Sequence, residues 1–257
     1  MNTTLITGAS SGIGAAFARK LAKRGRNVLL VARSEDKLIA LCNEIGRVSG
    51  IRAQYVAIDL TDADAPERLF EETKKRDLEI EMLVNNAGFG SMGDFEQQDR
   101  EHELEMIDLN VKSLVDLTYR FLGPMRDRHQ GTIINVASTA AFQAVPYMAT
   151  YAATKAFVLS FSQALWEENR QYGVHVLALC PGVTDTNFFA AAKIDRPPMR
   201  TVQTPEEVVD AALRGMARRK SVVVSGWTNW VTVEAQRFVP RGFVTKFVGR
   251  AFRSRLE

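Results

Sequence analysis

Short apolar segments alternate with longer amphipathic segments along most of the chain. The apolar segments predict strands at Thr3–Thr7, Asn27–Val31, Ala53–Ile58, Met82–Asn85, Thr132–Val136, Val174–Leu179 and Ser221–Val224. The segments between them have helical spacing, and we predict helices at Gly14–Arg24, Asp36–Arg47, Ala65–Lys75, Glu101–Arg128, Ala149–Tyr172 and Pro205–Arg218. Thr204 before a proline, with Glu207 three residues later, predicts a capping box at the start of the last helix.

The apolar character of the strands indicates how they are covered. They carry too few polar positions to leave one face in water, which is typical of a parallel sheet with helices on both faces. Regular strand–helix alternation therefore predicts an α/β fold, a Rossmann-type doubly wound parallel sheet of about seven strands. We expect residues 1–225 to form one domain, and residues 226–257 to form a basic, aromatic, helical C-terminal extension that is not an independent domain.

Composition adds few constraints on function. The 257 residues, 46% hydrophobic and 25% charged, fit one globular domain. No apolar run approaches the ~18 residues of a membrane span, and the chain starts directly with a predicted strand, so we expect a cytoplasmic protein without a cleavable signal. Neither the two cysteines nor the three histidines have the spacing of metal ligands, so we predict no metal site and a buried, unreactive Cys180.

The segment Thr7–Gly14 joins the first predicted strand to the first predicted helix. Its glycines have G-x-x-x-G-x-G spacing and are Gly8, Gly12 and Gly14. Such a turn lets the backbone approach a pyrophosphate at the helix N-terminus, although a tight turn without a ligand has the same composition. Ser10 and Ser11 either bind phosphate or cap the helix. The position in the first strand–helix unit favours a dinucleotide site.

The ends of the second and third predicted strands would lie beside the adenosine half of a bound dinucleotide. Where NAD-binding proteins place a carboxylate for the ribose, this sequence has Arg33, which can pair with a 2′-phosphate and favours NADP(H). The alternative is a solvated Arg33 paired with Glu35 or Asp36. Asp59, after the third strand, can accept from the adenine amino group, cap the helix that follows, or do both.

Tyr151 and Lys155 lie four residues apart on one predicted helix and so share a face. An ammonium close to the phenol would favour the phenolate and lower its pKa from ~10. Ser138, at the end of a strand, could bind the same substrate oxygen that the phenol protonates. Such a pair is also common on solvated helix surfaces, so its weight comes from the surrounding motifs.

These motifs occur in the order of one known family. They are the Thr7–Gly14 turn, Asp59, Asn85–Gly88, Asn110, Ser138, Tyr151, Lys155 and Pro181-Gly182. From Thr3 to about Val224 the chain resembles the short-chain dehydrogenase/reductase family, in its single-domain, NADP(H)-preferring branch. The resemblance implies a dinucleotide-binding and catalytic domain over residues 1–225.

The resemblance also implies a role for each matched residue. Tyr151 would be the general acid in carbonyl reduction and the base in alcohol oxidation, with Lys155 lowering its pKa and holding the nicotinamide ribose. Ser138 would polarise the carbonyl, and Asn110 would hold a water of a proton relay. The implied NADP(H)-binding residues are Gly8, Ser10, Ser11, Gly12, Ile13, Gly14, Arg33, Asp59, Leu60, Asn86, Ala87, Gly88, Tyr151, Lys155, Pro181, Gly182, Val183 and Thr186, the last at the carboxamide or the pyrophosphate.

The substrate end is expected to be mainly apolar. Its candidate residues are Ser138, Phe142, Met148, Tyr151, Val183 and Phe188, and residues 139–150 contain no arginine or lysine. An apolar ketone or aldehyde and its alcohol are therefore the expected substrates of an NADP(H)-dependent oxidoreductase. One alternative is a protein that senses NADP(H) without turnover. Another is an epimerase or dehydratase, which usually has a larger region than the ~75 residues after Pro181.

The basic surplus of the chain lies in its tail. Residues 237–257 carry six of the 33 basic residues and a single acid, Glu257, so the rest is slightly acidic and no nucleic-acid site is predicted. Aromatic residues alternate with these cations, a pattern compatible with peripheral contact to an anionic membrane, with a cover over the substrate cleft, or with a subunit contact. The resemblance implies a homodimer or homotetramer formed through the helices that contain Asn110 and Tyr151.

Overall fold

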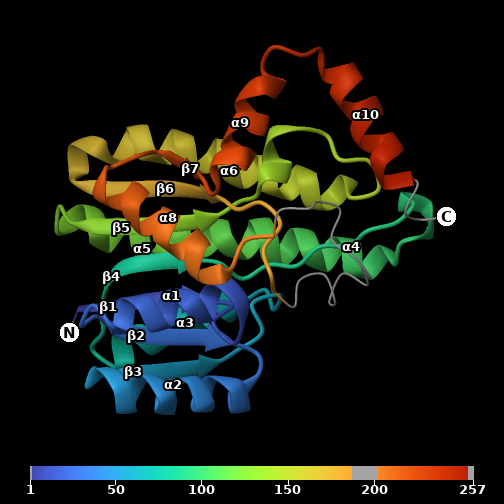
Figure 1. The fold of residues 1–257 in the computed structure, drawn as a ribbon. Coiled ribbons are helices and arrows are strands. Elements are labelled where there is room, and N and C mark those ends of the chain that lie inside the picture. The colour runs from blue at the N-terminus through green and yellow to red at the C-terminus, as the bar shows by residue number, and fades with distance from the viewer. Residues whose placement is uncertain (1, 187–201, 254–257) are drawn as a thin grey trace.

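The computed structural model describes residues 2–186 and 202–253, and it has one parallel sheet between two layers of helices (Figure 1). Among these residues the sheet has seven strands in the order β3-β2-β1-β4-β5-β6-β7. The strands are β1 (Asn2–Thr7), β2 (Asn27–Ala32), β3 (Ala53–Ala57), β4 (Glu79–Asn85), β5 (Gly131–Val136), β6 (Val174–Cys180) and β7 (Val222–Val224). The predicted Rossmann-type doubly wound sheet is confirmed.

Neighbouring residues of each central strand face opposite layers. Ile6 packs with α1 (Gly12–Ala22), α2 (Glu35–Ser49) and α8 (Pro205–Ala217) on one face. Leu5 packs with α3 (Ala65–Lys75), α5 (Leu114–Asp127) and α6 (Ala149–Asn169) on the other. Two buried faces explain why the strands are apolar at nearly every position. The predicted capping box is also present, since the Thr204 hydroxyl accepts from the Glu207 N–H at 3.2 Å.

The long helix predicted from Glu101 to Arg128 is interrupted. It consists of α4 (Arg100–Ile107), a π-helical segment η2 (Asp108–Ser113) that contains Asn110, and α5. π-Helical turns inside α-helices often mark functional sites. The helix predicted from Ala149 to Tyr172 is α6 followed by the 3-10 turn η4 (Arg170–Tyr172), and it stops at Gly173, whose φ is +71°. Short 3-10 turns η1 (Phe95–Gln97) and η3 (Thr139–Phe142) lie in the loops before α4 and after β5.

Two helices, α9 (Trp227–Gln236) and α10 (Arg241–Arg253), follow β7 and form an arm in which α9 leaves the sheet and α10, after a bend, returns toward the rest of the molecule (Figure 1). No helix among the described residues is long and apolar enough to cross a membrane. The predicted division into residues 1–225 and 226–257 stays a prediction.

Candidate active site

The strand order reverses beside β1, which lies between β2 and β4. In a doubly wound sheet the crevice outside the carboxyl ends of such strands is where ligands bind. The loops after β1 and β4 meet there, because the Asn86 side-chain amide donates to the backbone oxygens of Thr7 at 2.9 Å and Gly8 at 3.2 Å. The sequence-predicted phosphate turn and the Asn85–Gly88 segment are therefore adjacent.

The glycines of the phosphate turn are required by its geometry. Gly8 has a φ of +64° and Gly12 a φ of +53°, both in the left-handed region that favours glycine. A Cβ added to Gly14 would lie 2.3 Å from the Gly8 carbonyl oxygen. The turn is thus a close-packed backbone cradle at the N-terminus of α1, a fit for a pyrophosphate. Ser11 occupies the N-cap of α1 without a side-chain capping bond.

Gly14→Ala is expected to lower the free energy of unfolding by at least about 2 kcal/mol, because its Cβ would overlap backbone that cannot move freely. Gly46→Ala is the matched control: Gly46 lies within α2 with open space around its Cβ, so alanine there should stabilise by about 1 kcal/mol. Urea unfolding of both variants measures the difference. Equal stabilities would show that the turn is not close-packed.

At the adenosine end, the Arg33 guanidinium pairs with the Asp59 carboxylate at 3.4 Å. Among the described ion pairs Arg33 has neither Glu35 nor Asp36 as partner, and Glu35 instead accepts from the Tyr55 hydroxyl. Asp59 also accepts from the N–H of Thr61 at 3.0 Å, so its capping role is present. Burial alone would raise the pKa of Asp59, but the bonds from Thr61 and the charge of Arg33 lower it.

The catalytic candidates converge at the end of β5 and on α6. A side-chain hydrogen bond links Ser138 to Tyr151, although it is weaker than burial in its effect on the phenol. The Lys155 Nζ lies 5.8 Å from the centroid of the Tyr151 ring and donates to the Val136 carbonyl oxygen at 2.9 Å. The structure therefore brings Ser138, Tyr151 and Lys155 together, as the sequence predicted.

Two pKa values of this group are shifted, mainly by burial. Burial raises the pKa of Tyr151 to about 12, with the Ser138 bond opposing the rise. Burial also lowers the pKa of Lys155 to about 8, which the nearby Cys180 partly opposes. Burial of the phenol therefore outweighs the groups that favour the phenolate, and the lowering of the Tyr151 pKa by Lys155 stays a prediction.

Asn110 connects the β4 loop to α6. Its Nδ2 donates to the Phe89 carbonyl oxygen at 3.0 Å and to the Thr154 hydroxyl at 3.1 Å, and its Oδ1 accepts from the Phe89 N–H. Both amide hydrogens are thus used within the protein, so a relay water can bind only to oxygens of Asn110. The Thr154 hydroxyl in turn donates to the Tyr151 carbonyl oxygen at 2.7 Å. Asn110 lies at the site, and its relay role stays a prediction.

The loop after β6 closes the crevice from the other side. The Thr139 N–H donates to the Pro181 carbonyl oxygen at 2.8 Å, which fixes this loop beside Ser138. A Cβ on Gly12 would lie 2.9 Å from Cγ2 of Thr186, so Thr186 contacts the phosphate turn. Of the two predicted positions for Thr186, this contact favours the pyrophosphate.

The substrate candidates do not form one group. Met148 packs in a cluster with Val145, Tyr151 and, from α10, Val248 and Phe252. Phe142 packs instead with residues of α5, α6 and β6. Val183 is partly buried and accepts from the Gln203 N–H. Phe188 lies outside the described residues.

Sequence reasoning missed three contributors to the site. Thr154 belongs to no motif, but its hydroxyl accepts from Asn110 Nδ2 at 3.1 Å. Asn229 on α9 is buried, and a Cβ on Gly182 would lie 2.3 Å from its Nδ2. His102 on α4 stacks on Phe89 with ring centroids 4.6 Å apart. A helix-face pattern could have indicated only Thr154, since it lies three residues after Tyr151 on α6.

Cys180 and His175 lie in packed surroundings. Cys180 is fully buried as expected, and the His175 ring bonds to the Lys220 carbonyl oxygen at 2.8 Å. The part of the chain that the structure describes contains no cluster of potential metal ligands.

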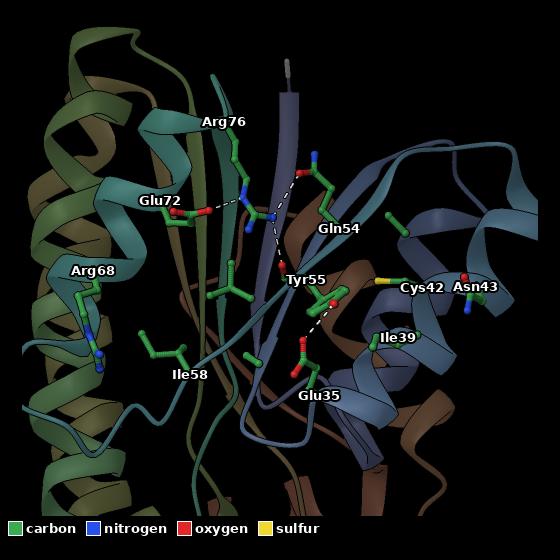
Figure 2. A pocket seen from close by; sticks show the side chains of 13 residues that line it. Glu35, Ile39, Cys42, Asn43, Gln54, Tyr55, Ile58, Arg68, Glu72 and Arg76 are labelled. Carbon is green, nitrogen blue, oxygen red and sulfur yellow. Dashed lines mark hydrogen bonds and ion pairs between the residues drawn. The ribbon is translucent and has the colours of Figure 1, made fainter.

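A groove of about 830 Å³ runs along the outer edge of β3, between α2 and α3 (Figure 2). It lies away from the Tyr151 group, and several of its polar side chains are paired with one another. Arg76, for example, bonds to Glu72 at 2.8 Å and to the Tyr55 carbonyl oxygen at 3.0 Å. These bonds occupy the edge of the sheet, so we assign no chemistry to this groove.

The parallel sheet, the glycine cradle and the Ser138–Tyr151–Lys155 group together define a dinucleotide-binding oxidoreductase of the Rossmann type. A sequence profile described as short chain dehydrogenase matches residues 2–197, and the chain belongs to this family.

Relatives of known name are similar over most of the chain. The very-long-chain 3-oxoacyl-CoA reductase of Macaca fascicularis is 34% identical over 239 residues, which cover 87% of this chain and 73% of the relative. The 7beta-hydroxysteroid dehydrogenase of Mediterraneibacter gnavus is 32% identical over 233 residues, which cover 89% and 88% of the two chains. A short-chain dehydrogenase from Sphingobium yanoikuyae, solved in complex with NADPH, has a TM-score of 0.84 and 35% identity, covering 92% of this chain and 94% of that one.

Proposed function

We propose that the protein is an NADP(H)-dependent oxidoreductase that interconverts an apolar ketone or aldehyde and its alcohol. The main support for this proposal is that Ser138, Tyr151 and Lys155 lie together in a fold that also has the glycine cradle. In this proposal Tyr151 transfers the proton and Ser138 orients the carbonyl. Lys155 holds the ribose hydroxyls, and the cradle with Thr186 holds the pyrophosphate. The cofactor, when bound, supplies or accepts the hydride.

A bulky apolar substrate is supported by both the site and the relatives. Met148 and Val145 pack in one apolar cluster with Tyr151, to which Val248 and Phe252 of α10 also belong. Two relatives are named for very-long-chain acyl and steroid substrates. Each buried methylene contributes about 0.8 kcal/mol, so affinity should rise with substrate size until this surface is covered.

The proposal is tested by NADPH oxidation with purified protein and a chain-length series of ketones and aldehydes. We expect turnover, with kcat/KM rising several-fold for each of the first added methylenes. Turnover with a flat or falling series would reject the apolar pocket and leave the reductase assignment intact. No turnover despite NADPH binding would favour the alternative, a sensor of NADP(H); an assembled Tyr151 group argues against that alternative.

Arg33→Ser is expected to raise the KM for NADPH by roughly 10- to 100-fold and to leave the KM for NADH nearly unchanged, because a charge-assisted bond to a 2′-phosphate is lost. The Arg33 side chain is 71% exposed, so the fold should be unaffected. Arg24→Ser, another exposed arginine in the turn before β2 and so at the other end of that strand, is the control. Equal effects on both cofactors would refute the assigned NADP(H) preference.

We also propose a cytoplasmic homodimer or homotetramer that pairs through η2, α5 and α6. Exposed aromatic residues on these helices support the pairing: Tyr119 is 82% exposed and Phe157 is 42% exposed. Sedimentation velocity would show a monomer if this pairing is absent.

A further inference from the structure

The outward side of α10 carries two phenylalanines between two cations. Their spacing along the helix places them in one row, which we call the tail stripe: Phe243, Lys246, Phe247 and Arg250. Phe243 is 64% exposed and Phe247 is 67% exposed. Large apolar side chains in such a row are unusual on a surface that faces only water.

The opposite side of α10 is already packed, so the tail stripe cannot turn inward. Val248 and Phe252 lie in the cluster that contains Met148 and Tyr151. Arg253 Nε donates to the Tyr147 hydroxyl at 3.0 Å, next to this cluster. These contacts fix the helix in orientation and leave the tail stripe to the outside.

Exposed aromatic residues continue from the tail stripe along the arm. Phe238, before the bend, is 88% exposed, and Trp227 and Trp230 of α9 are 77% and 54% exposed. Residues 226–253 contain five arginines and lysines and one acid, Glu234. That acid is paired with Arg237 at 2.9 Å. The arm therefore combines exposed aromatic area with a strong positive charge.

We propose that the tail stripe, with the neighbouring exposed aromatic residues of the arm, docks the protein on an anionic lipid surface. Phenylalanine and tryptophan favour the boundary between head groups and acyl chains, while Lys246 and Arg250 reach the lipid phosphates. A second copy is a poorer partner, because a two-fold contact through the tail stripe would bring its own cations together. Since the inner side of α10 adjoins Tyr151, docking places the catalytic group near the lipid. This docking does not depend on turnover.

The test is co-sedimentation of the full chain with phosphatidylcholine vesicles, with and without phosphatidylserine. We expect binding only to vesicles with phosphatidylserine, and loss of binding at high salt. Lys246→Glu/Arg250→Glu should weaken binding by about 25-fold or more, since each cation at an anionic surface contributes about five-fold. Phe243→Ser/Phe247→Ser should weaken it by at least about 10-fold.

Two control variants, one single and one double, accompany these variants. Phe95→Ser replaces a phenylalanine of equal exposure on η1, and Arg24→Glu/Arg47→Glu reverses two exposed cations away from the arm. Both should bind as the unchanged protein does, and thermal unfolding checks that every variant is folded. Absence of binding at low salt overturns the proposal, and so does equal binding by the tail-stripe variants. Light scattering that shows an oligomer dissociating in those variants, without vesicle binding, would assign the arm to a subunit contact.

Discussion

Tyr151→Phe is expected to lower kcat/KM for ketone reduction by about 10³-fold, because general acid catalysis contributes about 10²- to 10⁴-fold. The ring stays, so the packing with Met148 is preserved and only the hydroxyl bonded to Ser138 is lost. The free energy of unfolding should therefore change by no more than about 1 kcal/mol. Initial rates with NADPH and urea unfolding measure the two effects.

Tyr172→Phe removes a hydroxyl from a tyrosine in η4, keeps the ring that Arg126 contacts, and is the control for that substitution. Its rates should equal those of the unchanged protein. A Tyr151→Phe variant that keeps more than about a tenth of the activity would exclude Tyr151 as the proton donor. A loss of less than about 10-fold is smaller than the rate enhancement that general acid catalysis contributes.

The pH dependence of the unchanged protein follows from the same hydroxyl. With the pKa of Tyr151 near 12, the phenol is protonated at neutral pH and ready to donate in carbonyl reduction. Alcohol oxidation needs the phenolate, so its rate should rise between neutral and alkaline pH, and the rise should be absent in Tyr151→Phe.

Lys155→Met is expected to lower kcat/KM by at least about 10²-fold. The same substitution is expected to stabilise the fold. The pKa of Lys155 is about 8 in the folded chain, below the ordinary value of 10.5, because burial disfavours the ammonium. At pH 7 the folded protein therefore carries a buried charge that costs about 3 kcal/mol. Allowing for the lost bond to Val136, the variant should gain about 1–2 kcal/mol.

The pH dependence of the free energy of unfolding provides a second test of the buried Lys155 charge. Between about pH 8 and pH 10.5 the unfolded chain binds more protons than the folded chain, so the stability of the unchanged protein should rise with pH in this window. The advantage of Lys155→Met should shrink over the same window. Urea unfolding at pH 7 and pH 9.5 checks this, with the exposed Lys37→Met as control. A variant less stable than the unchanged protein at pH 7 would show that the ammonium is well solvated or compensated.

The sequence alone determined the sheet and the identity of the family. Every predicted strand is present, because strands buried on both faces must be apolar throughout, and this pattern is readable locally. The glycines of the Thr7–Gly14 turn and the Tyr151–Lys155 spacing are also local. Their chemistry depends on residues that are close in the chain, so they could be found without a structure.

Only the tertiary structure decided the electrostatics and the neighbours of the site. Whether Lys155 lowers the pKa of Tyr151 depends on burial and on the Val136 carbonyl, which the chain folds beside it from β5. The same holds for Asn229, which reaches Gly182 from α9. The alternation of aromatic and basic residues in the tail is visible in the sequence, but which of them face Tyr151 and which face outward is set by packing across more than 90 residues of chain separation.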